Sequence, residues 1–260
     1  MLMKSSLLFG TERQAQILAL IGEHGSVNVA NLVARFSISP ATARRDLDEM
    51  AANGQLRRTH GGAVARSERQ TDSAFAARQA LHIEEKSRIG RICAGLIGSD
   101  ETIFLDAGTT VLTVARHIQP PGPALIVTNS APLPLGLPAA LRAQIYVIGG
   151  EFRAANLSHV GADAVAALAT FRFSTAVIGC GGIDPERGIV TTPSVAEAAV
   201  QRAAIMRANR VIVVADTSKF GAEAAVVITA LDAVTTIVTG GLPADTVKRL
   251  GPWNLQLVQT

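Results

Sequence analysis

Short runs of Val, Ile and Leu recur along residues 83–260 and alternate with stretches of helical character. Such runs are typical of strands buried on both faces, and the intervening helices supply the crossovers that parallel strands need. The expected strands are Thr102–Asp106, Ala124–Asn129, Gln144–Gly149, Thr175–Cys180, Val211–Asp216, Val234–Thr239 and Leu255–Gln259. The expected helices are Ile83–Ile97, Thr110–Ile118, Ala162–Phe171, Val195–Asn209 and Ala244–Leu250. The pattern predicts an α/β domain over 83–260, built on a mostly parallel sheet covered on both sides.

Residues 9–66 follow a different pattern. The expected elements are helices at Glu12–Gly25, Val29–Phe36 and Ser39–Gly54, followed by a short hairpin at Gln55–Val64. The third helix has a clear start, because the Ser39 hydroxyl can accept a hydrogen bond from a free backbone N–H. Pro40 follows at a position where a missing N–H costs nothing. Three helices and a small hairpin in this order predict an N-terminal winged helix-turn-helix domain.

The third helix has two distinct sides. Ala43, Leu47 and Met50 recur at helical spacing and form an apolar face, while Arg44 and Arg45 project from the remainder. A short helix with an apolar back and two guanidinium groups at its front suits the DNA major groove. The candidate DNA-binding residues are Ser39, Thr42, Arg44 and Arg45 of this helix and Arg57, Arg58 and His60 of the hairpin. The hairpin residues are expected at the phosphate backbone or a minor groove, and an ordinary exposed hairpin is the alternative.

The net charge of +3 is unevenly distributed. Residues 1–70 hold nine Lys and Arg against six Asp and Glu, whereas residues 71–260 hold fifteen of each. A basic segment on a neutral body indicates a polyanionic partner, although a solvated basic surface explains the charge alone equally well. Residues 67–82 are polar and rich in Ala, and we expect them to form a linker that runs into a helix.

Polar residues and glycines follow five of the expected strands. Ligands of open α/β sheets bind outside the carboxyl ends of the strands. The turn after the first strand leads directly into a helix, where free N–H groups and threonine hydroxyls favour a phosphate. The candidate effector-binding residues are Asp106, Gly108, Thr109, Thr110, Thr128, Asn129, Ser130, Gly149, Gly150 and Lys219. One such turn is explained by a sharp bend in the backbone, but five on one predicted edge favour a ligand site.

Several classes of ligand and location are disfavoured. The sequence lacks GxxxxGK[ST], and no GxGxxG opens the first helix of the α/β region, so a small anionic metabolite fits better than a dinucleotide. We expect no cofactor and no metal, and Cys93 and Cys180 read as small buried apolar residues. No apolar run approaches the ~20 residues of a membrane span, and the N-terminal run is too short for a signal peptide. A cytoplasmic location is the default expectation.

The chain resembles the DeoR-type transcriptional regulators over nearly its whole length. In the first region the matching residues are Ser39-x-x-Thr42-x-Arg44-Arg45-Asp46-Leu47 and Gly54-x-Leu56-x-Arg58-x-His60-Gly61-Gly62-Ala63. In the second they are Glu85-Lys86, Leu105–Thr110, Thr128-Asn129-Ser130, Gly149-Gly150 and Ser218-Lys219-Phe220. The resemblance implies a sensor domain similar in fold to ribose-5-phosphate isomerase. It also implies a regulator, often a repressor of sugar or polyol catabolism genes, that a phosphorylated intermediate releases from DNA.

The chain departs from the family pattern at four places. Ala43 replaces a larger Ile or Val in the third helix, which should loosen its packing. Ser174-Thr175 stand where an acidic residue is common, Gln201 replaces a common lysine, and Gly240 stands where Asp is frequent. These departures concern the identity of the effector more than the fold.

Three functions follow from these observations, and the first is favoured. It is a DNA-binding regulator with double-stranded operator DNA and a small phosphorylated metabolite as partners. One short recognition helix reads too few base pairs for useful specificity, so we expect a homo-oligomer, dimer or tetramer. The second is a sugar-phosphate isomerase with acid–base chemistry from Asp106, Asp184, Glu197 and Lys219. The third is a DNA-binding architectural protein without a ligand, which the clustered strand ends disfavour.

Overall fold

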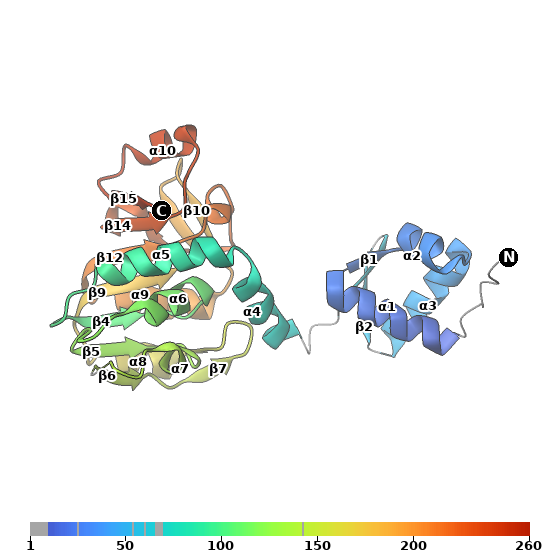
Figure 1. Cartoon of the computed structure of the whole chain (residues 1–260), viewed down its shortest axis with the longest axis horizontal. Helices are drawn as coiled ribbons and strands as arrows, with labels where there is room; N and C mark the ends of the chain where they lie inside the picture. The colour runs from blue at the N-terminus through green and yellow to red at the C-terminus, as the bar shows by residue number, and fades with distance from the viewer. Residues whose placement is uncertain (1–9, 25, 54, 60, 66–69, 142) are drawn as a thin grey trace. The chain divides into compact units, whose positions relative to one another are not determined.

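The computed structural model describes residues 10–24, 26–53, 55–59, 61–65, 70–141 and 143–260. The chain divides into two compact units, with the boundary between Thr71 and Asp72. Figure 1 shows the elements of each unit, which are described separately.

The first unit is a small domain of three helices and a three-stranded sheet. Its elements are α1 (Gly10–His24), β1 (Ser26–Asn28), α2 (Val29–Phe36), α3 (Pro40–Ala52), β2 (Leu56–Thr59) and β3 (Gly62–Ala65). The strands pair antiparallel in the order β1-β3-β2. The predicted winged helix-turn-helix is therefore confirmed, with β2 and β3 as the wing. The short strand β1, which the sequence did not predict, joins the wing to the end of α1.

The start of α3 has the predicted cap. The backbone N–H of Thr42 donates to the Ser39 hydroxyl at 3.0 Å, and Pro40 occupies the first turn. Ala43, Leu47 and Met50 are fully buried in the core of this unit. Two contacts from Arg13 of α1 to the Asp46 carboxylate, at 2.6 and 3.0 Å, fix the orientation of α3 against α1.

The second unit is built on one seven-stranded parallel sheet. Its strands are β4 (Thr102–Leu105), β5 (Leu125–Thr128), β6 (Gln144–Val147), β9 (Phe173–Gly179), β12 (Ala208–Val214), β14 (Thr236–Thr239) and β15 (Gln256–Gln259). They lie in the order β15-β14-β12-β9-β4-β5-β6, and every pairing is parallel. These are the seven strands that the sequence predicted, so the expected fold class is confirmed.

Helices cover both faces of this sheet. They are α5 (Ile83–Gly95), α6 (Thr109–His117), α7 (Leu133–Gly136), α8 (Ala162–Leu168), α9 (Val195–Ile205) and α10 (Ala244–Leu250). Alternate residues of β4 separate into two cores: Ile103 and Leu105 pack with α5 and α6, whereas Phe104 packs with α8 and α9. The continuous apolar sequence of these strands is therefore explained, because helices bury both faces of the sheet.

Residues 70–80 form helix α4 (Gln70–Ala80), within the segment 67–82 that was expected to be a linker running into a helix. The ring of Phe75 is 5% exposed and belongs to the core that α5 and α6 build on the sheet. Because this burial is a tertiary contact, the local composition gave no sign of it. Of the predicted linker, residues 67–69 lie outside the described residues, as does residue 66 at the expected end of the first domain.

The second unit also contains smaller elements that the sequence did not predict. A hairpin consists of β7 (Glu151–Arg153) and β8 (Ser158–Val160), and a three-stranded antiparallel sheet consists of β10 (Gly182–Asp184), β11 (Ile189–Thr192) and β13 (Val226–Ala230). Short 3-10 turns lie at Thr217–Lys219 and Leu231–Ala233. Cys93 and Cys180 are free thiols; Cys93 is buried, as predicted, whereas Cys180 is only partly buried. None of the described helices is long and apolar enough to cross a membrane.

Candidate functional site

The exposed side of α3 carries the residues predicted to read DNA. Arg44 and Arg45 are exposed, on the side of α3 opposite the buried Ala43, Leu47 and Met50. The hydroxyls of Ser39 and Thr42 lie 2.8 Å apart, so both are engaged at the helix start. Two exposed guanidinium groups on a rigid helix can contact base edges or phosphates.

Of the three residues predicted at the wing, Arg58 has contacts that the structure describes. Arg58 donates from Nε to the Asp48 carboxylate of α3 at 2.7 Å and from its terminal nitrogen to the Gly62 carbonyl. It therefore ties the wing to α3. Arg57 lies in β2, but its side chain is outside the described residues, and so is His60.

A cleft of about 490 Å³ lies at the carboxyl ends of the parallel strands in the second unit. Its walls come from several parts of the chain: α4 and α5, the turn from β4 to α6, the β7–β8 hairpin, α9, and the turns after β9 and β12. The polar and charged residues that line it include Arg78, His82, Lys86, Thr109, Thr110, Arg153, Asn156, Glu197, Gln201, Asp216 and Lys219. We call this cleft the sensor pocket.

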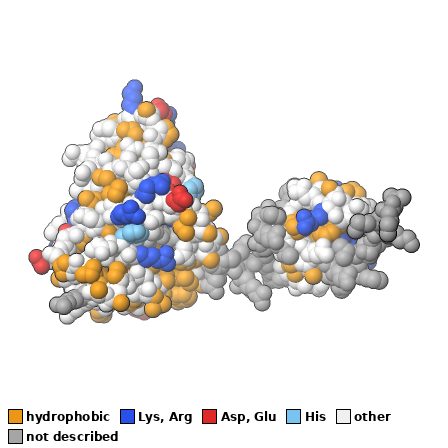
Figure 2. Space-filling view, in the orientation of Figure 1, with side chains coloured by type: hydrophobic (Ala, Val, Ile, Leu, Met, Phe, Trp, Pro, Cys, Tyr) orange, Lys and Arg blue, Asp and Glu red, His pale blue; other side chains and the backbone are white. Residues whose placement is uncertain are grey.

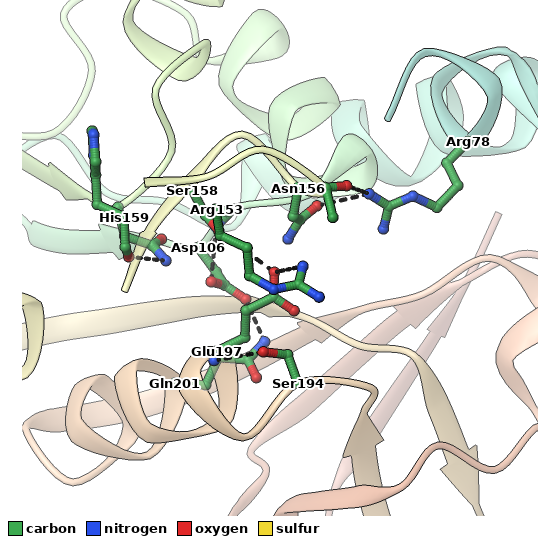
Figure 3. Close-up of polar contacts among 12 residues, drawn as sticks. Arg78, Asp106, Arg153, Asn156, Ser158, His159, Ser194, Glu197 and Gln201 are labelled. Atoms are coloured by element: carbon green, nitrogen blue, oxygen red, sulfur yellow. Dashed lines mark hydrogen bonds and ion pairs between the residues drawn. The ribbon is translucent and has the colours of Figure 1, made fainter. Parts of the chain in front are cut away.

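Asp106 lies beneath the sensor pocket and organises its floor. Its carboxylate accepts hydrogen bonds from the backbone N–H of Ala107 at 2.8 Å and Gly179 at 3.2 Å. The Gln201 amide donates to the same carboxylate at 2.7 Å and to the Gly179 carbonyl at 3.0 Å. Figure 3 shows Asp106 and Gln201 beside Glu197. Because the Asp106 oxygens are engaged in this way, this residue positions two strand ends rather than offering a free acid or base.

Burial raises the pKa of Asp106 to about 7, although the hydrogen bond from Gln201 acts in the opposite direction. Glu197 adds to the increase through its negative charge. The amide oxygen of Gln201, which lines the sensor pocket, is buried without a hydrogen-bond partner. A buried acceptor of this kind is costly unless a donor reaches it, so a ligand hydroxyl is the chemistry it suits.

The raised pKa of Asp106 has a testable consequence. From its ordinary value of 3.8 up to about 7, the folded chain keeps a proton on Asp106 that the unfolded chain has released. The contribution of this residue to stability therefore falls as the pH rises through that window, by about 1.4 kcal/mol per pKa unit. We expect the free energy of unfolding of the wild type to fall relative to that of Asp106→Asn between about pH 4 and 7, measured by urea denaturation. Parallel pH profiles for the two proteins would contradict the assignment.

Three cationic side chains, those of Arg78, Arg153 and Lys219, line the sensor pocket. Arg153 of β7 donates to the Glu197 carboxylate at 3.3 Å, and the Ser158 hydroxyl donates to the same oxygen at 3.5 Å. Arg78 of α4 donates to the Ala155 carbonyl at 2.7 Å and to the Asn156 amide oxygen at 3.1 Å. Figure 3 shows both arginines approaching the pocket, from the hairpin and from α4. Together with Lys219 they make this part of the pocket suited to an anion.

Lys86 is a further cation beside the pocket, and it has a structural role. Its ammonium group donates to the carbonyl of Leu81 at 2.8 Å and to the carbonyl of Arg78. Only 5% of the residue is exposed, and desolvation lowers its pKa. Lys86 therefore holds the last turn of α4 against α5.

The turn before α6 lies where the sequence predicted a helix start. Gly108 has a φ of 127°, a conformation that residues with a side chain rarely adopt, and a Cβ at this position would face open space. No side chain caps the first turn of α6 there, so its free N–H groups face the pocket beside Thr109 and Thr110. These groups and the dipole of the helix favour a phosphate.

Five predicted effector residues lie away from the pocket lining. Thr128, Asn129 and Ser130 are buried behind the pocket, where the Asn129 carbonyl accepts a hydrogen bond from the backbone N–H of His159. Gly149 and Gly150 form the turn into β7, and a Cβ at Gly150 would lie 2.5 Å from the Val160 carbonyl oxygen. These residues position β7 and β8. Gly108, Thr109, Thr110 and Lys219 line the pocket, and Asp106 supports its floor.

The departure at Gly240 lies beside the Glu85 carboxylate. Glu85 accepts a hydrogen bond from the Thr217 backbone N–H at 2.7 Å, and a Cβ at Gly240 would lie 2.2 Å from the Glu85 carboxylate. His82, Glu85 and Asp216 place one potential metal-ligand atom each within 4.8 Å of one another. Glu85 and Asp216 already accept backbone hydrogen bonds from Thr217 and Ser218, so the group is explained by the structure of this turn.

Arg78, Arg153, Asn156 and Gln201 line the sensor pocket but were not predicted as site residues. Arg78 lay in the expected linker, and Arg153 and Asn156 belong to the hairpin that the sequence did not predict. Of these four residues, only Gln201 gave a sequence signal of the pocket, because it is uncharged at a position where the family commonly has lysine.

A winged helix-turn-helix domain followed by an α/β domain with a pocket at its strand ends is an architecture typical of DNA-binding transcriptional regulators. Two family models match the chain: the DeoR-like helix-turn-helix domain over residues 13–69, and the DeoR C terminal sensor domain over residues 81–241. The chain therefore belongs to the DeoR family of transcriptional regulators. It is a regulator rather than an enzyme.

Curated relatives match over most of their length. The transcriptional repressor AccR of Agrobacterium fabrum is 37% identical, and the match covers 88% of each chain. The glycerol-3-phosphate regulon repressor of Escherichia coli is 32% identical, with 92% of this chain and 94% of the relative covered. Among solved structures, ribose 5-phosphate isomerase A from Neisseria gonorrhoeae matches 52% of each chain at 11% identity. The TM-score of this match is 0.38.

Proposed function

We propose that this protein represses transcription by binding an operator through α3 and the wing, and that a small phosphorylated metabolite in the sensor pocket releases it. A sugar or polyol phosphate is the effector class that we propose, and genes of carbohydrate or polyol catabolism are the targets. The sensor pocket supports the proposal most directly, since it combines the open N-terminus of α6 with Lys219, Arg78 and Arg153.

The two parts of the pocket suit two parts of such a molecule. A phosphate fits the N-terminus of α6, where backbone N–H groups and the hydroxyls of Thr109 and Thr110 are available as donors. Hydroxyl groups fit the floor, which is lined by the polar side chains of Gln201 and Glu197. Two relatives that are named as repressors support a repressor role, and one of them is the glycerol-3-phosphate regulon repressor.

Helix α4 offers a route from the pocket to the DNA-binding domain. It begins at Gln70, beside the boundary between the two units, and its Arg78 contacts the pocket wall at Ala155 and Asn156. An anion that competes for Arg78 would weaken these contacts and change the position of α4. A ligand shifts such an equilibrium only by its differential affinity for the two states, and contacts to Arg78 that exist in one state supply that difference.

The proposal can be tested without knowing the operator. Purified full-length protein would be used to select binding sequences from random duplex DNA. Phosphorylated sugars and polyols would then be compared with their unphosphorylated forms for release of the selected duplex. We expect a single family of duplexes and release by a phosphorylated compound alone. Failure to enrich any sequence would overturn the DNA-binding part, and release by unphosphorylated compounds alone would overturn the effector class.

Replacing Lys219 tests the assignment of the anion site. We expect Lys219→Ala to bind the operator normally but to need at least ~10-fold more effector for half release, since a charge-assisted hydrogen bond contributes about 1.5–3 kcal/mol. Lys248→Ala is the matched control, because Lys248 is an exposed lysine on α10. Gel-shift titrations with effector give both values. Loss of operator binding in Lys219→Ala, with effector binding intact, would contradict this division of roles.

A further inference from the structure

Strand β6 (Gln144–Val147) ends the seven-stranded sheet with an unpaired side. It pairs with β5 on one side, and no described strand pairs with the other. A strand in this position presents a row of backbone N–H and carbonyl groups that another extended strand can bind. This open side is therefore a candidate surface for pairing with a second chain.

All four side chains of β6 are exposed, and three of them are apolar. Ile145 is 43% exposed, Tyr146 50% and Val147 40%, and the neighbouring Phe152 of β7 is 51% exposed. The strand itself contains no charged residue. Edge strands that must stay unpaired are usually protected by lysines, prolines or bulges, so this edge lacks the common protection. Figure 2 shows hydrophobic side chains gathered over the end of the second unit that carries β6 and β7.

Two other edge strands of the same unit differ from β6 in their side-chain contacts. Val227 of β13 is also 43% exposed, but Arg202 of α9 donates to the carbonyls of Val227 and Ile228, which occupies that edge. At the opposite end of the large sheet, Leu257 and Val258 of β15 pack against the hydrophobic cores. Strand β6 is thus an edge that combines open backbone groups with exposed apolar side chains.

We propose that β6 pairs antiparallel with β6 of a second copy of this chain, so that one sheet continues across a two-fold axis. Around such an axis residue i contacts residue j and j contacts i, so a charge on this four-residue strand would lie close to the same charge on the partner strand. An uncharged strand avoids this repulsion and is complementary to itself. The choice of a second copy rests in part on the proposed DNA binding, since one recognition helix covers a half-site and two-fold symmetry supplies the other.

Charge substitutions at Ile145 test this surface. We expect sedimentation analysis of the full-length chain to show an even-numbered oligomer for the wild type and half that mass for Ile145→Lys and Ile145→Glu. An equimolar mixture of the two variants should regain the wild-type mass, because opposite charges then meet across the axis. Val227→Lys is the matched control, since it adds a charge to an equally exposed strand residue, and its mass should stay at the wild-type value.

Two further measurements keep the outcomes distinct. Thermal melting of each variant shows whether the second unit remains folded. Hydrogen exchange should show β6 amides that are protected in the wild type and exchange faster in Ile145→Lys. A monomeric wild type, or unchanged mass in both Ile145 variants, would overturn the proposed pairing. The shift of the melting temperature by phosphorylated metabolites is measured separately on the same proteins. The absence of a shift would count against the proposed effector and would leave the measured oligomer mass unaffected.

Discussion

Arg44→Ala and Arg45→Ala are each expected to lose most specific operator binding while the fold stays intact. A bidentate contact between arginine and guanine contributes about 1–3 kcal/mol of discrimination, and an operator with two half-sites doubles the loss. Neither side chain faces the core of the first unit, whose buried face of α3 is formed by Ala43, Leu47 and Met50. Gel shifts against the selected operator and against unrelated DNA measure the loss, and circular dichroism confirms folding.

The same two variants separate base reading from phosphate contact. Replacing an arginine that reads a base should relax the sequence preference at one position of the operator. Replacing one that contacts a phosphate should lower the salt dependence of binding by about one counterion. Arg35→Ala is the matched control, since Arg35 is an exposed arginine at the end of α2. Operator affinity at the wild-type level in both Arg44→Ala and Arg45→Ala would exclude α3 as the recognition helix.

The sheet was predictable because its information is local to each strand. Ile103, Phe104 and Leu105 are successive apolar residues, and the structure places them alternately in the cores on the two sides of β4. The cap of α3 was predictable for the same reason, since Ser39, Pro40 and Thr42 lie within one turn. A strand or a helix start was therefore predicted correctly where three or four neighbouring residues determine the backbone conformation.

The pocket was only partly predictable because its walls depend on contacts between distant residues. Gly149 and Gly150 look like a ligand-binding turn, yet Gly150 is required by the close approach of the Val160 carbonyl. Helix α4 looks like a linker until Phe75 is seen in the core. Asp106 and Gln201 are 95 residues apart in the chain, and their hydrogen bond is fixed by the packing of α9 beneath β4 and β9.

The departure at Ser174-Thr175 shows how a local substitution can be compensated from elsewhere. The Thr175 hydroxyl donates to the Glu101 carboxylate at 2.6 Å, and Arg210 contacts the same carboxylate at 2.9 Å. Glu101 therefore brings an acidic group to the start of β9, although residues 174 and 175 carry none. Because Glu101 precedes β4 and Arg210 belongs to β12, the sequence alone could not connect these three residues.

Arg78→Ala is expected to separate effector binding from operator release. Arg78 links α4 to the Ala155 and Asn156 wall of the sensor pocket, and α4 starts beside the boundary with the DNA-binding domain. Without this link an effector in the pocket loses a differential contact through which it could change α4. We expect saturating effector to release the wild type but to leave most of the Arg78→Ala protein on the operator.

The measurement requires two titrations of each protein. Effector binding is followed by calorimetry and should weaken by no more than ~10-fold, since Lys219, Arg153 and the N-terminus of α6 remain. Operator release is followed by fluorescence anisotropy of labelled duplex. Arg88→Ala is the matched control, because Arg88 is an exposed arginine on α5, and it should respond as the wild type does. Full release of Arg78→Ala at saturating effector would show that the signal leaves the pocket by another route.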